Sequence, residues 1–182
     1  MSTAPQTAGA RTDDARLVSV YRRVLTLLGI GTVLGALTEL AMLRHWQGPG
    51  QLVPWAVLAV LLLGAVAWLV RRTTGTARTV RVAAVVSVLG SAYGVYEHVL
   101  ANLRAGPLDP RYAEAWDAMS GAARLWAATS GAVGPSPVLV PGTMGLAGVL
   151  LWLAVLRWRR GTDRARSAAG GGERGGAGTM GP

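Results

Sequence analysis

Four apolar stretches, each close to the length of a membrane crossing, limit the folds open to this 182-residue chain. They cover residues 24–43, 53–70, 82–103 and 138–156. A helix of about 20 residues crosses a hydrocarbon core of about 30 Å, and lipid forces backbone groups to bond within the segment. Because 51% of the residues are hydrophobic, the composition agrees. The sequence therefore predicts an all-α membrane protein, an up-down bundle of four transmembrane helices.

Two tails flank this predicted transmembrane domain, which covers residues 20–160. Residues 1–19 are rich in small and polar types, and residues 161–182 are rich in Gly and Arg. Neither tail has an apolar period, so we expect both to be disordered and cytoplasmic. The first apolar run is too long for the core of a cleaved signal peptide, and we expect it to remain as an anchor.

The arginines predict the orientation of the bundle. The chain has no Lys, so its eighteen basic residues are all Arg. With both termini in the cytoplasm, fourteen of them lie inside, and only Arg44, Arg104, Arg111 and Arg124 lie outside. This asymmetry follows the positive-inside rule and predicts that the N and C termini are cytoplasmic.

The net charge of +9 therefore reflects topology, and we expect the lipid bilayer as a partner and no nucleic acid. The use of Arg without Lys, together with many Gly, Ala and Val, indicates a GC-rich bacterial coding sequence. The expected location is the bacterial plasma membrane, that is, the inner membrane, with several crossings.

The loop between the third and fourth apolar stretches holds a predicted amphipathic helix at about 110–129. Asp109 and Pro110 suit an N-cap followed by Pro at the first helical position. Trp116 and Trp126 would share its apolar face. We expect this helix to lie in the outer membrane interface or to cover the mouth of the bundle.

The third apolar stretch carries a polar stripe. At about 100° per residue, one side of this helix would present small and polar residues, while the opposite side is apolar. The stripe comprises Ser87, Ser91, Gly94, His98 and Asn102, with Gly90, Tyr93 and Glu97 beside it. We expect it to face other helices or a water-filled cavity.

A polar or ligand-binding site is predicted in the outer leaflet, from Glu39, Glu97, His98, His45 and Asn102. At 1.5 Å per residue, Glu39 lies about 7 Å and Glu97 about 10 Å below the outer boundary, with the histidines near that level. The competing interpretation is structural: Glu39 would pair with His98 or an outer arginine and join the first and third helices.

Metal and haem sites are weaker hypotheses at the same place. Glu39, Glu97 and His98 are the candidate metal ligands, because carboxylate and imidazole suit Zn²⁺ or another first-row divalent ion. His45 and His98 could hold haem from two helices. The sequence requires no cofactor. With no Cys, no phosphate-binding loop and no hydrolase motif, we do not expect an enzyme.

Six glycines are candidate helix-packing positions, since small residues let helices approach closely. They are Gly31 and Gly35 in the first apolar stretch, Gly90 and Gly94 in the third, and Gly145 and Gly148 in the fourth. These faces would suit a homo-oligomer or a membrane-protein partner.

The segment Tyr93-Gly-Val-Tyr-Glu-His98, the Asn102 after it, and the later Pro137-x-Leu-x-Pro141-Gly142-x-Met144 carry a resemblance. Here the chain resembles a family of small, uncharacterised bacterial four-span membrane proteins, over roughly residues 24–160. The resemblance implies a four-span fold and a membrane location, and no activity.

We therefore expect a small integral membrane binding or accessory subunit with a carboxylate and histidine site in the outer leaflet. One alternative is a small oligomeric transporter coupled to protons or cations, with the same residues as its relay. A second alternative is a membrane subunit that binds haem or quinone.

Overall fold

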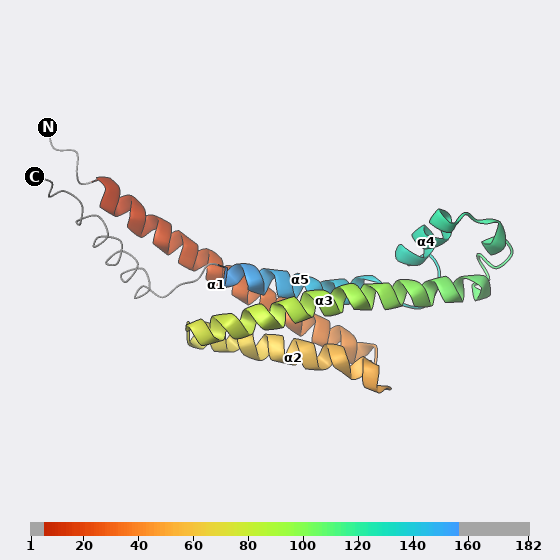
Figure 1. Cartoon of the computed structure of the whole chain (residues 1–182), viewed down its shortest axis with the longest axis horizontal. Coiled ribbons are helices and arrows are strands. Elements are labelled where there is room, and N and C mark those ends of the chain that lie inside the picture. Colours follow the sequence, from red (N-terminus) through yellow and green to blue (C-terminus); the bar gives the residue numbers. More distant parts are fainter. Residues whose placement is uncertain (1–5, 157–182) are drawn as a thin grey trace, which may run out of the picture.

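The computed structural model describes residues 6–156, whose regular secondary structure is all helical, with no strand among the described residues. Figure 1 shows long helices packed side by side and a small helical region at one end. The elements are α1 (Gln6–Met42), α2 (Pro49–Val70), α3 (Thr74–Ala105), η1 (Gly106–Leu108), η2 (Trp116–Ala118), α4 (Gly121–Thr129) and α5 (Leu139–Ala154). The all-α prediction is confirmed for this part of the chain.

Three of the helices are long and apolar enough to cross a membrane: Asp13–Met42, Pro49–Val70 and Thr74–Leu108. The fourth predicted span forms α5, which is apolar but has only 16 residues. At 1.5 Å per residue its helix is about 24 Å long, less than a hydrocarbon core of about 30 Å. By length and composition, the three longer helices indicate a membrane protein.

The prediction of a disordered tail over residues 1–19 is wrong from Gln6 onward, because α1 begins there. The segment is rich in Ala and Arg, which favour helix, and extending a helix that the apolar run has already nucleated costs little. Residues 1–5 of this tail and the predicted tail 161–182 lie outside the described residues.

The helix α5 packs against both α1 and α3 and runs antiparallel to both. Leu151 of α5 fills the space beside Gly29 of α1, where an added Cβ would lie 2.6 Å from its Cγ atom. Gly148 lies against α3, and an added Cβ would lie 2.9 Å from the carbonyl oxygen of Ala84. The main hydrophobic core joins these three helices to α2.

Two arginines hold the carboxyl end of α5. Arg22 of α1 donates to the carbonyl oxygens of Ala154 (3.3 Å) and Leu156 (2.9 Å), and Arg81 of α3 donates to that of Val155 (2.9 Å). The last carbonyls of a helix lack partners and carry partial negative charge, so guanidinium groups stabilise them. This contact fixes the end of α5 between α1 and α3.

Residues 106–137, here called the cap, pack on the carboxyl end of α3. Figure 1 shows this region, with α4, at the end of α3 that extends past the other long helices. A second apolar cluster of Trp116, Ala127, Ala128 and Val133 packs against Val99 and Leu103 of α3. The cap therefore has its own small core.

The predicted continuous helix over 110–129 is wrong, because α4 begins only at Gly121. The Asp109 carboxylate accepts the backbone N–H of Arg111, as an N-cap would, but the residues that follow form only turns and the short helix η2 before α4 begins. The cap of α4 is Ser120, whose hydroxyl oxygen accepts the N–H of Ala123 at 3.2 Å. Side chains such as Asp and Ser that compete for nearby backbone groups decide where helices start.

Candidate functional site: a polar ladder and a cleft

The polar stripe of α3 forms a ladder of hydrogen bonds to the chain leading into and along α5. Ser87 Oγ donates to the carbonyl oxygen of Met144 (2.7 Å), and Ser91 Oγ donates to that of Pro141 (2.6 Å). Farther along, His98 Nδ1 lies 2.8 Å from the carbonyl oxygen of Pro137. A carbonyl cannot donate, so Nδ1 carries the hydrogen. The stripe therefore faces another helix, as one of the two expectations had it.

Glycines let the two helices of the ladder approach. An added Cβ at Gly94 would lie 2.8 Å from Pro141 Cβ, and one at Gly145 would lie 2.9 Å from Ser91 Cβ. Gly90 touches Met144 and Gly148 touches Ser87 in the same interface.

The two glycines predicted for packing on α1 have a different environment. An added Cβ at Gly31 or Gly35 would meet nothing within 4 Å, and both positions are exposed. Within the described chain they do not contact another helix.

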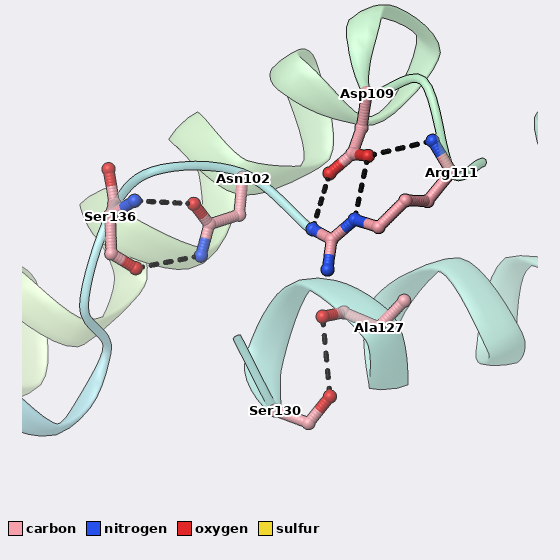
Figure 2. Close-up of polar contacts among 6 residues, drawn as sticks. All are labelled: Asn102, Asp109, Arg111, Ala127, Ser130 and Ser136. Atoms are coloured by element: carbon pink, nitrogen blue, oxygen red, sulfur yellow. Dashed lines mark hydrogen bonds and ion pairs between the residues drawn. The ribbon is translucent and has the colours of Figure 1, made fainter. Parts of the chain in front are cut away.

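Asn102 ends the ladder and attaches the cap to α3. Its side chain is fully buried. Its Nδ2 donates to the carbonyl oxygens of Ala128 (3.0 Å) and Ser136 (2.9 Å), and its Oδ1 accepts the N–H of Ser136 (2.9 Å; Figure 2). Both amide hydrogens and the oxygen are thus satisfied, so Asn102, a predicted site residue, makes structural contacts.

A second polar contact stabilises the cap at Asp109. Figure 2 shows the Arg111 guanidinium folded back onto this carboxylate, with bonds of 3.0 Å from Nε and 2.8 Å from an Nη atom. The side-chain and backbone hydrogen bonds from Arg111 lower the pKa of Asp109 to about 2. The carboxylate is therefore ionised at any physiological pH.

A cleft of about 550 Å³ lies between the tip of the α1–α2 hairpin and the helices α3 and α5. Figure 1 shows that this tip diverges from α3 and α5. We call the cleft of about 550 Å³ the hairpin cleft. Its polar lining consists of His45, Tyr93, Glu97 and His98. Its remaining lining is Ala36, Leu40, Gly50, Val53, Pro54, Val57, Leu58, Gly90, Gly94, Val140, Pro141 and Met144.

The end of α1 orients His45 toward this cleft. The N–H groups of Arg44 and His45 bond to the carbonyls of Ala41 (3.0 Å) and Leu40 (2.9 Å), with Arg44 at φ 52°. This is a Schellman ending with Arg in the place that usually holds Gly. Trp55 of α2 donates from Nε1 to the His45 carbonyl oxygen at 2.7 Å and fixes the hairpin tip.

His45 is half-buried, and this burial, reinforced by nearby His98, holds the pKa of His45 below its usual value. The unperturbed value is about 6.5, so the His45 imidazole is neutral at pH 7.

Glu97 is the carboxylate of the cleft. It is half-buried, and Tyr93, which also lines the cleft, lies one turn earlier on α3. The ion pairs of the described chain are Asp109 with Arg111 and Asp117 with Arg124, all in the cap. Among the described residues, then, Glu97 has no cationic partner.

Glu39, the other predicted carboxylate, is half-buried on α1 and does not line the cleft, although Ala36 and Leu40 do. The structure therefore brings together Glu97, His98 and His45 and leaves Glu39 and Asn102 elsewhere. Within residues 6–156 no group of three His, Asp or Glu side chains is placed to hold a metal ion, so Glu39, Glu97 and His98 do not form a ligand set.

Sequence reasoning missed the cleft walls supplied by the start of α2 and by the chain around Pro141. The prolines at 135, 137 and 141 were the available signal for the wall around Pro141. Proline has no N–H, so a proline-rich segment contacts a neighbouring helix through its carbonyl oxygens. No family model, curated protein or solved structure matches this chain.

Proposed function

We propose that this chain is a four-span protein of the bacterial plasma membrane with both termini in the cytoplasm. We further propose that it acts as a small binding or accessory subunit that holds a ligand in the hairpin cleft. The observation that carries the binding role is the cleft itself, which combines apolar walls with a carboxylate and two imidazoles. Pockets of this size and lining are typical of small-molecule sites.

The fourth crossing is supported by how the last segment pairs with α3. Ser136 is bonded to Asn102 and Val155 to Arg81. Asn102 lies 21 positions after Arg81 on the same helix, which amounts to about 31 Å at 1.5 Å per residue. Residues 136–155 would therefore cover a membrane thickness, although the helix α5 is shorter, because residues 136–138 precede it.

The backbone of this segment before α5 suits a membrane boundary. Irregular backbone is tolerated at membrane depth only when its polar groups have partners in the protein. Ser136 has both of its backbone groups bonded to Asn102, and the Pro137 carbonyl oxygen is bonded to His98. Pro137 itself has no N–H to satisfy.

The depth of the cleft follows from the same geometry. With Arg81 at the inner boundary, 20 helical residues place the outer boundary near Ala101. Glu97 then lies about 6 Å inside the outer boundary. A carboxylate at that depth is typical of a functional site in a membrane protein.

The transporter alternative draws on the same carboxylate. A half-buried Glu97 without an ion pair in the described chain would suit a proton or cation relay. Four spans would require an oligomer, for which the exposed face at Gly31 and Gly35 would be the contact.

The topology is tested by labelling with a membrane-impermeant maleimide, since the chain has no Cys of its own. The variant Ser130→Cys places a thiol in the cap, and Thr74→Cys places one at the exposed start of α3. In intact cells we expect labelling at position 130, and labelling at 74 only after permeabilisation. The reverse pattern would refute the orientation.

Ligand binding is tested by filling the cleft. Val53 lines it, while the neighbouring Leu52 is equally exposed on α2 but does not line it. Amphiphiles that copurify with the wild-type protein in native mass spectra should be lost from Val53→Trp and kept in the control Leu52→Trp. Equal retention in both variants would remove the cleft as the binding site.

A further inference from the structure

The polar and apolar groups of the hairpin cleft are separated along its length. The apolar Ala36 and Leu40 of α1 precede His45, which follows the end of that helix. On α3, Gly90 precedes Glu97 and His98. The polar groups therefore lie at the end nearest the cap.

The opposite end of the cleft is apolar. The helices α2 and α5 run in the other direction, so Leu58 and Met144 lie deeper than Val53 and Pro141. A ligand that satisfies both ends needs a polar head toward the cap and an apolar body below it.

The charge of the cleft favours one kind of head. Glu97 is its acidic residue, and among the described residues no arginine lines it. His98 Nδ1 is already bonded to Pro137, and burial keeps His45 neutral at pH 7 by lowering its pKa. A carboxylate withdrawn from water without a cation is costly, and a cationic head would remove that cost.

Two neighbouring features favour an organic cation over a metal ion. The aromatic ring of Tyr93 lies on the same stretch of α3 and offers a face that attracts ammonium groups. A divalent ion would need several ligands, and the described residues contain no such cluster.

We propose, on the basis of the ligand-binding function above, that the hairpin cleft takes an amphiphile with a single ammonium head. The head pairs with Glu97 beside Tyr93, and the apolar chain lies against Leu58 and Met144. An anionic head would be repelled by the Glu97 carboxylate, and a neutral head would leave the charge of that carboxylate unbalanced.

The test compares two probes with the same dodecyl tail: dodecyltrimethylammonium, which is cationic, and dodecyldimethylamine N-oxide, which has no net charge at pH 7. Binding to the full chain in lipid nanodiscs is measured by calorimetry, with empty nanodiscs subtracted. We expect the wild-type protein to bind the ammonium probe at least about ten-fold more tightly than the N-oxide, a difference of about 1.4 kcal/mol.

Four variants test which residues cause the preference for the ammonium probe. Glu97→Gln should lose the preference while still binding the N-oxide, which also shows that it is folded. Glu97→Asp should keep the preference. Glu114→Gln, which changes an exposed carboxylate of the cap outside the cleft, should behave as wild type. Val53→Trp should bind neither probe.

The possible failures are distinct. If both probes bind equally and Val53→Trp abolishes binding, the cationic preference is refuted and the ligand-binding cleft stands. If Glu97→Gln keeps the preference, the role of Glu97 is refuted. If Val53→Trp binds as wild type, both this inference and the proposed binding function are refuted.

Discussion

The side-chain amide of Asn102 forms a reciprocal pair of hydrogen bonds with the backbone of Ser136, each 2.9 Å long. It thereby imitates the pairing of two backbone strands from within a helix. The second hydrogen of Nδ2 reaches the carbonyl oxygen of Ala128, near the end of α4. One buried side chain thus joins α3, α4 and the chain leading to α5.

Replacing this side chain should loosen the cap. Asn102→Ala removes three hydrogen bonds and leaves backbone groups of Ser136 and Ala128 without partners. Each buried unpaired group costs about 1–3 kcal/mol, so we expect a loss of at least about 2 kcal/mol. Hydrogen–deuterium exchange of residues 106–137 should become faster, with little change in α2.

The matched control for Asn102 is Ser130→Ala, which removes one hydroxyl contact of 3.3 Å to the Ala127 carbonyl in the same region (Figure 2). Its exchange should remain close to wild type. Unchanged protection of the cap in Asn102→Ala would contradict the attachment role.

Two glycines of the cap separate backbone strain from steric collision. Gly131 and Gly134 have φ of +73° and +81°. An added Cβ at Gly131 would meet open space, whereas one at Gly134 would collide with Asn102. We expect Gly131→Ala to cost about 1 kcal/mol through strain alone, and Gly134→Ala to cost more because it also displaces Asn102. Thermal unfolding should rank them in that order; equal losses would show that the contact with Asn102 yields easily.

The α3–α5 contact should be sensitive to one methyl group. In Gly148→Ala the new Cβ would lie 2.9 Å from the Ala84 carbonyl oxygen, a backbone atom that cannot rotate away. Overpacking of this kind costs about 1–3 kcal/mol. Gly35→Ala, in open space on α1, should be neutral or raise stability by up to about 1 kcal/mol, because Ala favours helix. Unfolding midpoints in detergent measure both, and a destabilising Gly35→Ala would instead indicate a contact with a second copy.

The pKa of Asp109 predicts an acid-sensitive cap. Its folded pKa is about 2, below the usual value near 4, so the unfolded chain takes up the proton first. The stabilisation is complete above about pH 4 and is lost as the pH falls toward about 2. Pepsin should therefore cut the wild-type cap increasingly between pH 4 and pH 2.

Asp109→Asn should lack this pH-dependent component, because it has no carboxylate to titrate. Asp117→Asn is the control, since the Asp117 side chain is fully exposed and lies 3.9 Å from Arg124. A wild-type cap with no change in cleavage over this range, relative to Asp109→Asn, would contradict the prediction.

The sequence predicted the polar stripe of α3 because helical periodicity fixes which residues share a face. It left open whether that face meets a helix or water, and the backbone of residues 136–144 supplies the partners of Ser87, Ser91, His98 and Asn102. Helical periodicity does not predict which backbone carbonyl groups act as acceptors, because every residue has such a group.

The candidate site was harder to predict for two physical reasons. Depth follows from the rise per residue, but each residue also rotates by about 100°, and Glu39 therefore has a suitable depth without lining the cleft. His45 reaches the cleft through the left-handed backbone of Arg44, a conformation for which an arginine gives no signal. The start of α4 was misplaced because Ser120, and not Asp109, caps that helix.

The extension of α3 beyond the hairpin has a mechanical consequence. The cap is attached at Asn102, and the cleft is lined by His98, one turn earlier on the same rigid helix. These two side chains form hydrogen bonds to consecutive residues, Pro137 and Ser136, and the backbone continues from there into the cleft wall at Pro141. A displacement of the cap would therefore be transmitted to that wall through only four residues of chain, which couples the position of the cap to the width of the cleft.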